Sequence, residues 1–345
     1  MKIFERMPKT DTRIFWVLFG IVLIAGIMVH VSLWPMKAIR QDIQYIWRDS
    51  HSLFLGENPY ARIVGGPVRD NGKYSTYFPM FYTLGALAQT FGLRNYNNWT
   101  AFWKLIFLMC NLGITTVIFT SLYRRGMVAL AFLAAIFWLF NVWTISVSLE
   151  LQIDFIPILL LLLSLALFDK HRNVSLLLLS ASLAVKQLAI FLVPLYLIWV
   201  WQSSCTYKKV FVSSLIIISI PALTSLPFIV WNPEGFMKSI LFSTTRGSAN
   251  QFKLLPLEQI VQQIVPNFVG VSARLPMLFL MLLTYISALH RKIGMYLSVL
   301  LIMSIFADFN SVIFRQYMIW ILPFAPLAAC DFLYERQLTT KSLRL

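Results

Sequence analysis

Long runs of apolar residues, separated by short polar stretches, dominate the chain. About ten of these runs have roughly 15 to 24 residues each, the length that crosses about 30 Å of hydrocarbon as an α-helix. They lie at 14–34, 100–123, 127–148, 153–169, 173–186, 187–202, 209–231, 275–290, 293–308 and 313–333. The pattern predicts an all-α polytopic membrane protein with a single integral membrane domain over residues 1–345.

Composition favours the same class of protein. Hydrophobic residues make up 59% of the 345 residues and charged residues 12%, whereas a soluble domain carries about 25% charged residues. The formal net charge of +15 would suggest nucleic acid as the partner of a soluble protein. Here the basic residues lie in short loops between apolar runs, so we expect contacts with membrane lipids and none with nucleic acid.

A shorter, glycine-containing run at 78–93 decides the topology. If it does not cross, every compact basic cluster faces one side of the membrane: 2–13, 124–125, 170–172, 208–209, 291–292 and 336–344. The positive-inside rule makes that side the cytoplasm. We therefore expect both termini in the cytoplasm, 78–93 in or on the outer leaflet, and two long outer loops at 35–99 and 232–274. A bacterial cytoplasmic membrane is favoured, and an endoplasmic reticulum membrane gives the same orientation.

The first outer loop carries a polar stretch, "IRQDIQYIWRDSHSLFLGENPYARI", directly after the first apolar run. Asp42, Tyr45 and Asp49 follow an i, i+3, i+7 spacing, which places them on one face of a helix. The stretch predicts an amphipathic helix at the membrane surface with an acidic strip. The turn "GENPY", which contains Tyr60, folds the chain back toward the membrane. The alternative is that both acids are merely solvated.

Further polar residues beside the apolar runs are candidates for a binding site. Gln152 and Asp154 follow Glu150 at the outer mouth of two helices, a position that is often simply interfacial. Lys186 lies between two short apolar runs with no acid near it in the sequence. A lysine at membrane depth is costly and is a candidate for binding phosphate or for pairing with an opposite charge, unless it snorkels to the surface.

Two arginines complete the set of cationic candidates. Arg246 lies in the second outer loop among Ser, Thr and Gly, a mixture that suits phosphate. Arg315 begins the last apolar run, where it could instead pair with Asp308. We expect Lys186, Arg246 and Arg315 to converge in one pocket on the outer side.

The order of these motifs resembles the GT-C superfamily of integral-membrane glycosyltransferases. The closest likeness is to polyprenol- and dolichol-phosphate-mannose-dependent mannosyltransferases such as the catalytic subunit of GPI mannosyltransferase I. The matching pieces cover most of residues 40–255: "QDIQYIW…GENPYAR", "YSTYFPMFYTLGAL", "LQIDFIPILLLLLSL", "LAVKQLAIFLVPLYL" and "WNPEGFMKSILFSTTRGSANQF".

The resemblance implies a GT-C-like fold whose outer loops form the active-site face. It also implies transfer of a hexose, mannose by default, from a polyprenyl-phosphate sugar to a lipid or glycan acceptor. Asp42 would be the general base of an inverting displacement. The other candidates, Tyr45, Asp49, Tyr60, Gln152, Asp154, Lys186, Arg246 and Arg315, would bind substrate.

Metal and cofactor are not expected. Eukaryotic relatives carry Asp-x-Asp where this chain has Arg40-Gln41-Asp42, and one carboxylate is a poor site for Mg²⁺ or Mn²⁺. One carboxylate is enough to take the proton of the acceptor hydroxyl, and a cation stabilises the departing lipid phosphate. Two rival classes stay open: a lipid-carrier or solute transporter, and a scaffold or inactive relative. A transporter should show internal repeats and ionisable groups near the middle of the membrane. No convincing repeat is visible in this sequence.

Overall fold

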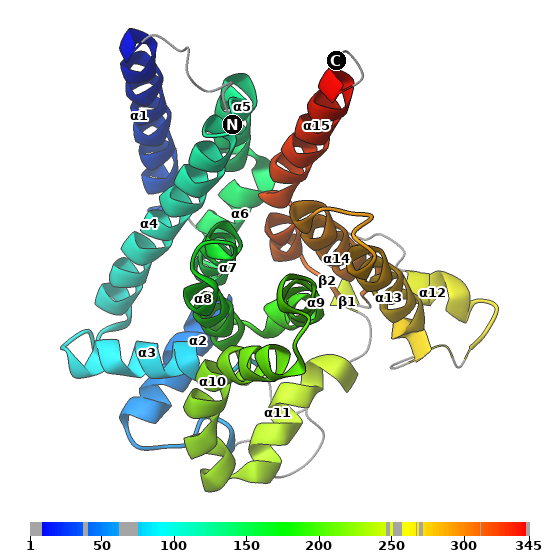
Figure 1. The fold of residues 1–345 in the computed structure, drawn as a ribbon. Coiled ribbons are helices and arrows are strands. Elements are labelled where there is room, and N and C mark those ends of the chain that lie inside the picture. The colour runs from blue at the N-terminus through cyan, green and yellow to red at the C-terminus, as the bar shows by residue number, and fades with distance from the viewer. Residues whose placement is uncertain are drawn as a thin grey trace.

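The structure is a computed structural model that describes residues 9–36, 41–61, 75–245, 249–250, 257–266, 268, 272–310 and 312–342. Nearly all of this backbone is helical (Figure 1). The exception is a two-residue parallel pairing of β1 (Ala249–Asn250) with β2 (Val312–Ile313). The predicted all-α class is therefore confirmed for the described residues.

The predicted apolar runs are helical, although 127–148 is divided into two helices and the runs at 187–202 and 313–333 each begin with a 3₁₀ turn. They are α1 (Lys9–Ser32), α4 (Tyr96–Tyr123), α5 (Val128–Phe140), α6 (Val142–Glu150), α7 (Phe155–Leu167), α8 (Arg172–Val185), α9 (Val193–Ser204), α10 (Tyr207–Trp231), α13 (Leu275–Leu289), α14 (Met295–Phe309) and α15 (Phe324–Ser342). Shorter helices lie between them: α2 (Gln41–Phe54), α3 (Met80–Thr90), α11 (Pro233–Thr245), α12 (Leu257–Gln262), and the 3₁₀ turns η2 (Gln187–Leu192), η3 (Ser272–Arg274) and η4 (Arg315–Trp320).

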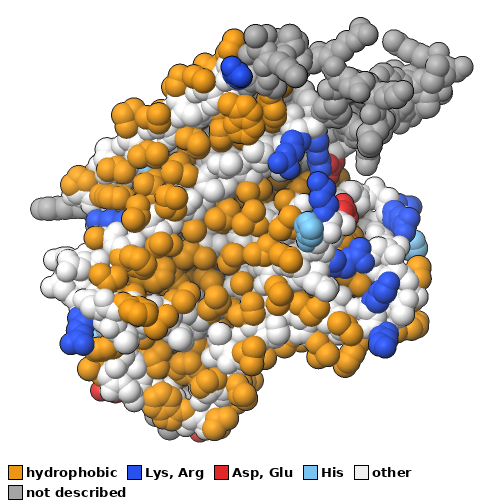
Figure 2. Space-filling model, turned by 60° about the vertical axis from the view of Figure 1, so that its left-hand side comes forward, with side chains coloured by type: hydrophobic (Ala, Val, Ile, Leu, Met, Phe, Trp, Pro, Cys, Tyr) orange, Lys and Arg blue, Asp and Glu red, His pale blue; other side chains and the backbone are white. Residues whose placement is uncertain are grey.

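Six segments of the described chain are long and apolar enough to cross a membrane. They are α1, α4, α10, and the continuous pairs η2–α9, η3–α13 and η4–α15; α5 and α6, bent by 40° at their junction, would make a seventh as a broken span. The helices α7, α8 and α14 are apolar but shorter. Figure 2 shows apolar side chains over most of one face, where a membrane would supply the solvent.

The junction of α5 and α6 is held by a buried polar cluster. Asn141 caps α6 by accepting hydrogen bonds from two backbone N–H groups of its first turn. The Leu139 carbonyl lies 3.0 Å from Nε2 of His30 on α1. Asn111 on α4 accepts a hydrogen bond from the Trp138 indole at 2.7 Å, and its amide nitrogen lies 3.1 Å from the same His30 nitrogen. Polar side chains from three helices thus surround the break, as a break inside a membrane requires.

The helices α2 and α3 pack side by side at the lower end of the molecule in Figure 1, close to α11 and the ends of α8 and α10. Gly85 makes this approach possible, because a Cβ at that position would collide with the Ser50 hydroxyl. The helix α3 has 11 residues. At 1.5 Å per residue it is only about 16 Å long, too short to cross about 30 Å of hydrocarbon. Because α7, α8 and α14 are also shorter than a full span, the non-spanning assignment of 78–93 stays a prediction.

Cysteine labelling tests the predicted topology. The natural Cys205, exposed between α9 and α10, should react with an impermeant maleimide only after the membrane is opened, because Lys208 and Lys209 follow it in the first turn of α10. In a Cys205→Ser background, Asn98→Cys should react from outside and Arg124→Cys should not. Outside labelling at position 124 without labelling at 98 would reverse the assignment of every later loop.

Candidate functional site

The acidic face of α2 lines a pocket. Asp42, Tyr45 and Asp49 lie there with Ile46, and the opposite side is formed by Thr76, Tyr77 and Tyr82. We call this the carboxylate pocket. The other face of α2 is buried in the protein, with Ile43 fully buried. The space left between these side chains would hold about one water molecule.

The two acids of the pocket have different surroundings. Asp49 is only 1% exposed. Its Oδ2 accepts a hydrogen bond from the Ser75 hydroxyl at 2.8 Å, and its Oδ1 lies 3.5 Å from Nε of Arg48. Asp42 is only partly buried. Asp49 is therefore held by its neighbours inside the pocket, whereas part of the Asp42 side chain is exposed.

Two buried tyrosines, Tyr60 and Tyr82, lie next to these acids, and the Tyr60 hydroxyl donates a hydrogen bond to the Tyr77 carbonyl. Burial, and secondarily the charge of Asp49, raises the pKa of the Tyr82 hydroxyl above its usual range. Burial also raises the pKa of Tyr60. Both groups therefore keep their protons at neutral pH, and neither can act as a general base there.

The short segment Ser75–Phe78, which we call the strap, forms one wall of the pocket. It is held from three directions. The Ser75 hydroxyl donates to Asp49 on α2. The Tyr60 hydroxyl donates to the Tyr77 carbonyl at 2.8 Å, and the Gln187 amide donates to the Thr76 carbonyl at 2.7 Å. The strap is thus tied to α2, to the turn at Tyr60 and to the start of η2.

Behind the strap lies a buried ion pair. Nζ of Lys186 is 2.6 Å from Oδ1 of Asp154, and the two side chains are 3% and 0% exposed. The Trp320 indole donates to the same Oδ1 at 2.6 Å. Lys186 has extended backbone angles between α8 and η2, so the chain leaves the helix at the predicted position. The sequence showed no acid near Lys186; the fold supplies one from 32 residues earlier in the chain.

Tyr77 is shared by the pocket and the ion pair. Its side chain lines the carboxylate pocket. Nζ of Lys186 lies 5.4 Å from the centroid of its ring, within the range of a cation–π contact. Tyr77 therefore lines the same pocket as the two carboxylates and also contacts a buried cation.

The remaining predicted residues lie in different settings. Tyr60 is fully buried, and its hydroxyl donates a hydrogen bond to the Tyr77 carbonyl in the strap. Gln152 is buried at the end of α6. Arg315 lies 4.0 Å from Glu150, so its ion-pair partner is not the Asp308 considered from the sequence. Arg246 lies outside the described residues, so the expected convergence with Lys186 remains a prediction.

Sequence reasoning missed the strap and Trp320. A signal for the strap was present, because "YSTYFPMF" concentrates aromatic and hydroxyl side chains just before a short apolar run. Trp320 had no such signal, since an indole within an apolar run is normally read as packing. Its role depends on a contact with Asp154, which is 166 residues away in the sequence.

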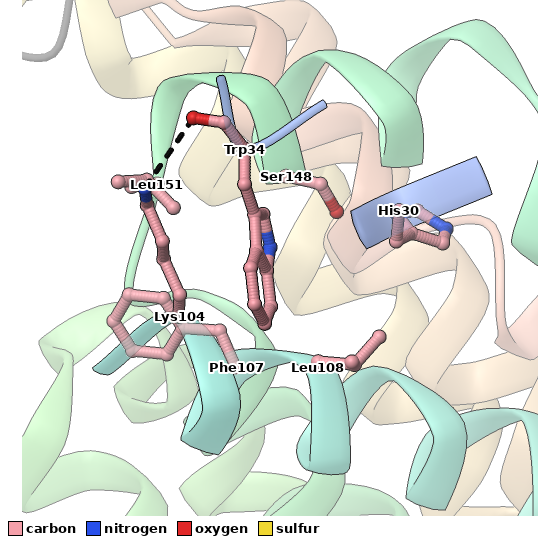
Figure 3. Close-up of a pocket in the computed structure, with 7 residues that line it drawn as sticks. All are labelled: His30, Trp34, Lys104, Phe107, Leu108, Ser148 and Leu151. Atoms are coloured by element: carbon pink, nitrogen blue, oxygen red, sulfur yellow. Dashed lines mark hydrogen bonds between the residues drawn. The ribbon is translucent and has the colours of Figure 1, made fainter. Parts of the chain in front are cut away.

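A second small cavity lies between α1, α4 and α6 (Figure 3). It is lined by His30, Trp34, Lys104, Phe107, Leu108, Ser148 and Leu151. Lys104 donates a long hydrogen bond of 3.4 Å to the Trp34 carbonyl. Nδ1 of His30 is buried without a hydrogen-bond partner in the described part of the chain. The cavity has room for about one water molecule, which suits hydration of the polar cluster at the α5–α6 break.

Within the described ranges, no three His, Cys, Asp or Glu side chains come together in a way that could hold a metal ion. No family model matches the sequence, and no curated protein matches it at a significant level.

Proposed function

We propose that this chain is a GT-C-like glycosyltransferase that moves a hexose from a polyprenyl-phosphate sugar to a lipid or glycan acceptor at the outer membrane surface. The observation that supports this best is that Tyr77 links a carboxylate and a cation. Tyr77 lines one pocket with the partly buried Asp42, and the Lys186 ammonium lies 5.4 Å from the centroid of its ring. Transfer from a lipid phosphate needs both a base for the acceptor and a cation near the departing phosphate.

In the proposed reaction Asp42 takes the proton of the acceptor hydroxyl as its oxygen attacks the anomeric carbon. The bond to the lipid phosphate breaks on the opposite face of the sugar, which inverts the configuration. A single displacement of this kind needs one essential carboxylate, unlike a glycosidase pair. A hexose is larger than the space inside the carboxylate pocket, so side chains of the pocket must move when the donor binds.

The proposed membrane arrangement keeps all ten predicted spans. The seven candidates of full length would be joined by α7, α8 and α14, whose shortness suits helices that end at a site inside the protein. The carboxylate pocket then faces the outer side, and the termini face the cytoplasm. The charge pattern supports this orientation, and we favour a bacterial cytoplasmic membrane.

A transporter of lipid carriers or solutes is the second candidate, and two observations favour it. One span is broken at Asn141, and an ion pair lies buried inside the helical bundle. Broken helices and buried ionisable groups are both typical of transport sites. The partly exposed Asp42 of the carboxylate pocket is the feature that a transporter would not require.

One experiment separates these candidates. The purified protein in vesicles should transfer labelled sugar from a polyprenyl-phosphate hexose to endogenous lipid or glycan acceptors, and the product should have the inverted anomeric configuration. Movement of lipid or solute across the vesicle membrane without any sugar transfer, over a panel of donor sugars, would replace the enzyme with a transporter.

A further inference from the structure

We propose that Tyr77 is a positioning residue that holds the Lys186 ammonium at the wall of the carboxylate pocket. This inference rests on the proposed function, because it assigns the cation and the carboxylates to one substrate. The ring belongs to the strap and lines the pocket, and the ammonium lies 5.4 Å from its centroid.

The two carboxylate oxygens of Asp154 in the ion pair have different surroundings. Oδ1 of Asp154 receives both the Lys186 ammonium and the Trp320 indole, each at 2.6 Å. Oδ2 of the same carboxylate is buried without a hydrogen-bond partner in the described residues. The contact with Tyr77 gives the ammonium a second partner, and that partner lines the carboxylate pocket.

The backbone around the ring is fixed on both sides. Both carbonyls of Thr76 and Tyr77 accept side-chain hydrogen bonds, from Gln187 and Tyr60 respectively. Gln187 directly follows Lys186 in the chain, so the residue next to the cation also anchors the strap. The distance between the ring and the ammonium is therefore set by two neighbouring attachments rather than by one flexible side chain.

A donor whose sugar enters the carboxylate pocket would bring its phosphate near the Lys186 ammonium that Tyr77 holds. Tyr77 attracts the cation by the negative face of its ring, and that attraction is lost when the ring is made electron-poor. Without it the ammonium is drawn only to Asp154, away from the pocket. Withdrawing electron density from the Tyr77 ring should therefore weaken the interaction between Lys186 and a lipid phosphate, while the shape of the pocket wall stays the same.

The test replaces Tyr77 by phenylalanine and then by phenylalanines with one, two and three ring fluorines. Two quantities are measured on each variant: binding of polyprenyl phosphate, and the kcat/KM of sugar transfer. Tyr77→Phe, which removes the hydroxyl and keeps the ring, is the reference against which the fluorinated variants are compared. Both quantities should then fall stepwise by about 2- to 30-fold in total, the range that corresponds to a cation–π contact. The unfolding temperature should stay constant along the series.

Phe81 provides the matched control. It is buried on α3, and its ring packs on Trp103 with centroids 4.5 Å apart. The same fluorinated series there should change neither binding nor transfer. A flat series at position 77, or an equal decline at position 81, would overturn the role of Tyr77.

The proposed function can fail separately from the role of Tyr77. If phosphate binding falls stepwise in a chain that transfers no sugar, the role of Tyr77 stands and the enzymatic function does not. Loss of both readouts in the natural chain would overturn both proposals.

Discussion

Asp42→Asn should abolish sugar transfer while leaving folding and donor binding nearly intact. Asparagine keeps the shape of the side chain and one acceptor oxygen, but it cannot take a proton. The loss should therefore fall on the chemical step, and removal of a general base costs roughly 10²- to 10⁴-fold in rate. The measurements are single-turnover transfer, binding of the donor and thermal unfolding. A fall in kcat with unchanged donor affinity is the expected result.

Two other acids show whether the effect is specific to Asp42. Glu57→Gln removes an exposed charge from the same outer loop and should leave the rate unchanged. Asp49→Asn should lower the unfolding temperature more than the rate, because Asp49 is buried and bound to Ser75 and Arg48. It lies about two helical turns, or roughly 10 Å, from Asp42, so both acids cannot hold one hydroxyl. Wild-type rates in both Asp42→Asn and Asp49→Asn would mean that the base is elsewhere. Asp154 is then a poor substitute, since it is fully buried behind Lys186.

Much of the secondary structure could be predicted because hydrophobic runs and helical spacing are local signals. The i, i+3, i+7 spacing was enough to place Asp42, Tyr45 and Asp49 on one face, and they line one pocket. The short runs on both sides of Lys186 were enough to predict that helix ends there. What the periodicity does not show is how deeply a face is buried. Asp49 was expected on a surface strip, but neighbouring α3 and the strap cover it.

Long-range partners could not be predicted, for a physical reason. A cation inside an apolar region must find a counter-charge or reach water, but the residues next to it in the sequence do not show which of the two occurs. For Lys186 the answer came from Asp154, 32 residues away in the chain, and that acid in turn is bound by Trp320, 166 residues further on. The same holds for Arg315, which had Asp308 as its nearest acid in the sequence but lies against Glu150 in the fold. These contacts depend on helix packing that no local pattern encodes.

Lys186→Met should destabilise the protein strongly as well as abolish transfer. The substitution leaves the Asp154 carboxylate buried without its counter-charge. Breaking a buried pair by removing one partner costs about 3–5 kcal/mol of unfolding free energy. Asp154→Asn should also destabilise the fold, since it strands the ammonium while keeping an acceptor for the Trp320 indole. Unfolding followed by tryptophan fluorescence in detergent measures both losses.

The double variant Asp154→Asn with Lys186→Met separates stability from chemistry. With both charges gone, no uncompensated charge remains, so much of the lost unfolding free energy should return. Transfer should not return, because the cation that faces Tyr77 and the pocket is still missing. If the double variant regains stability and also transfers sugar at the natural rate, the pair serves folding alone and the phosphate cation must be sought elsewhere. If it regains neither, then the introduced amide and thioether side chains do not pack in place of the pair. In that case the charge-preserving variant Asp154→Glu, which keeps Lys186, should transfer sugar even where the fold is loosened.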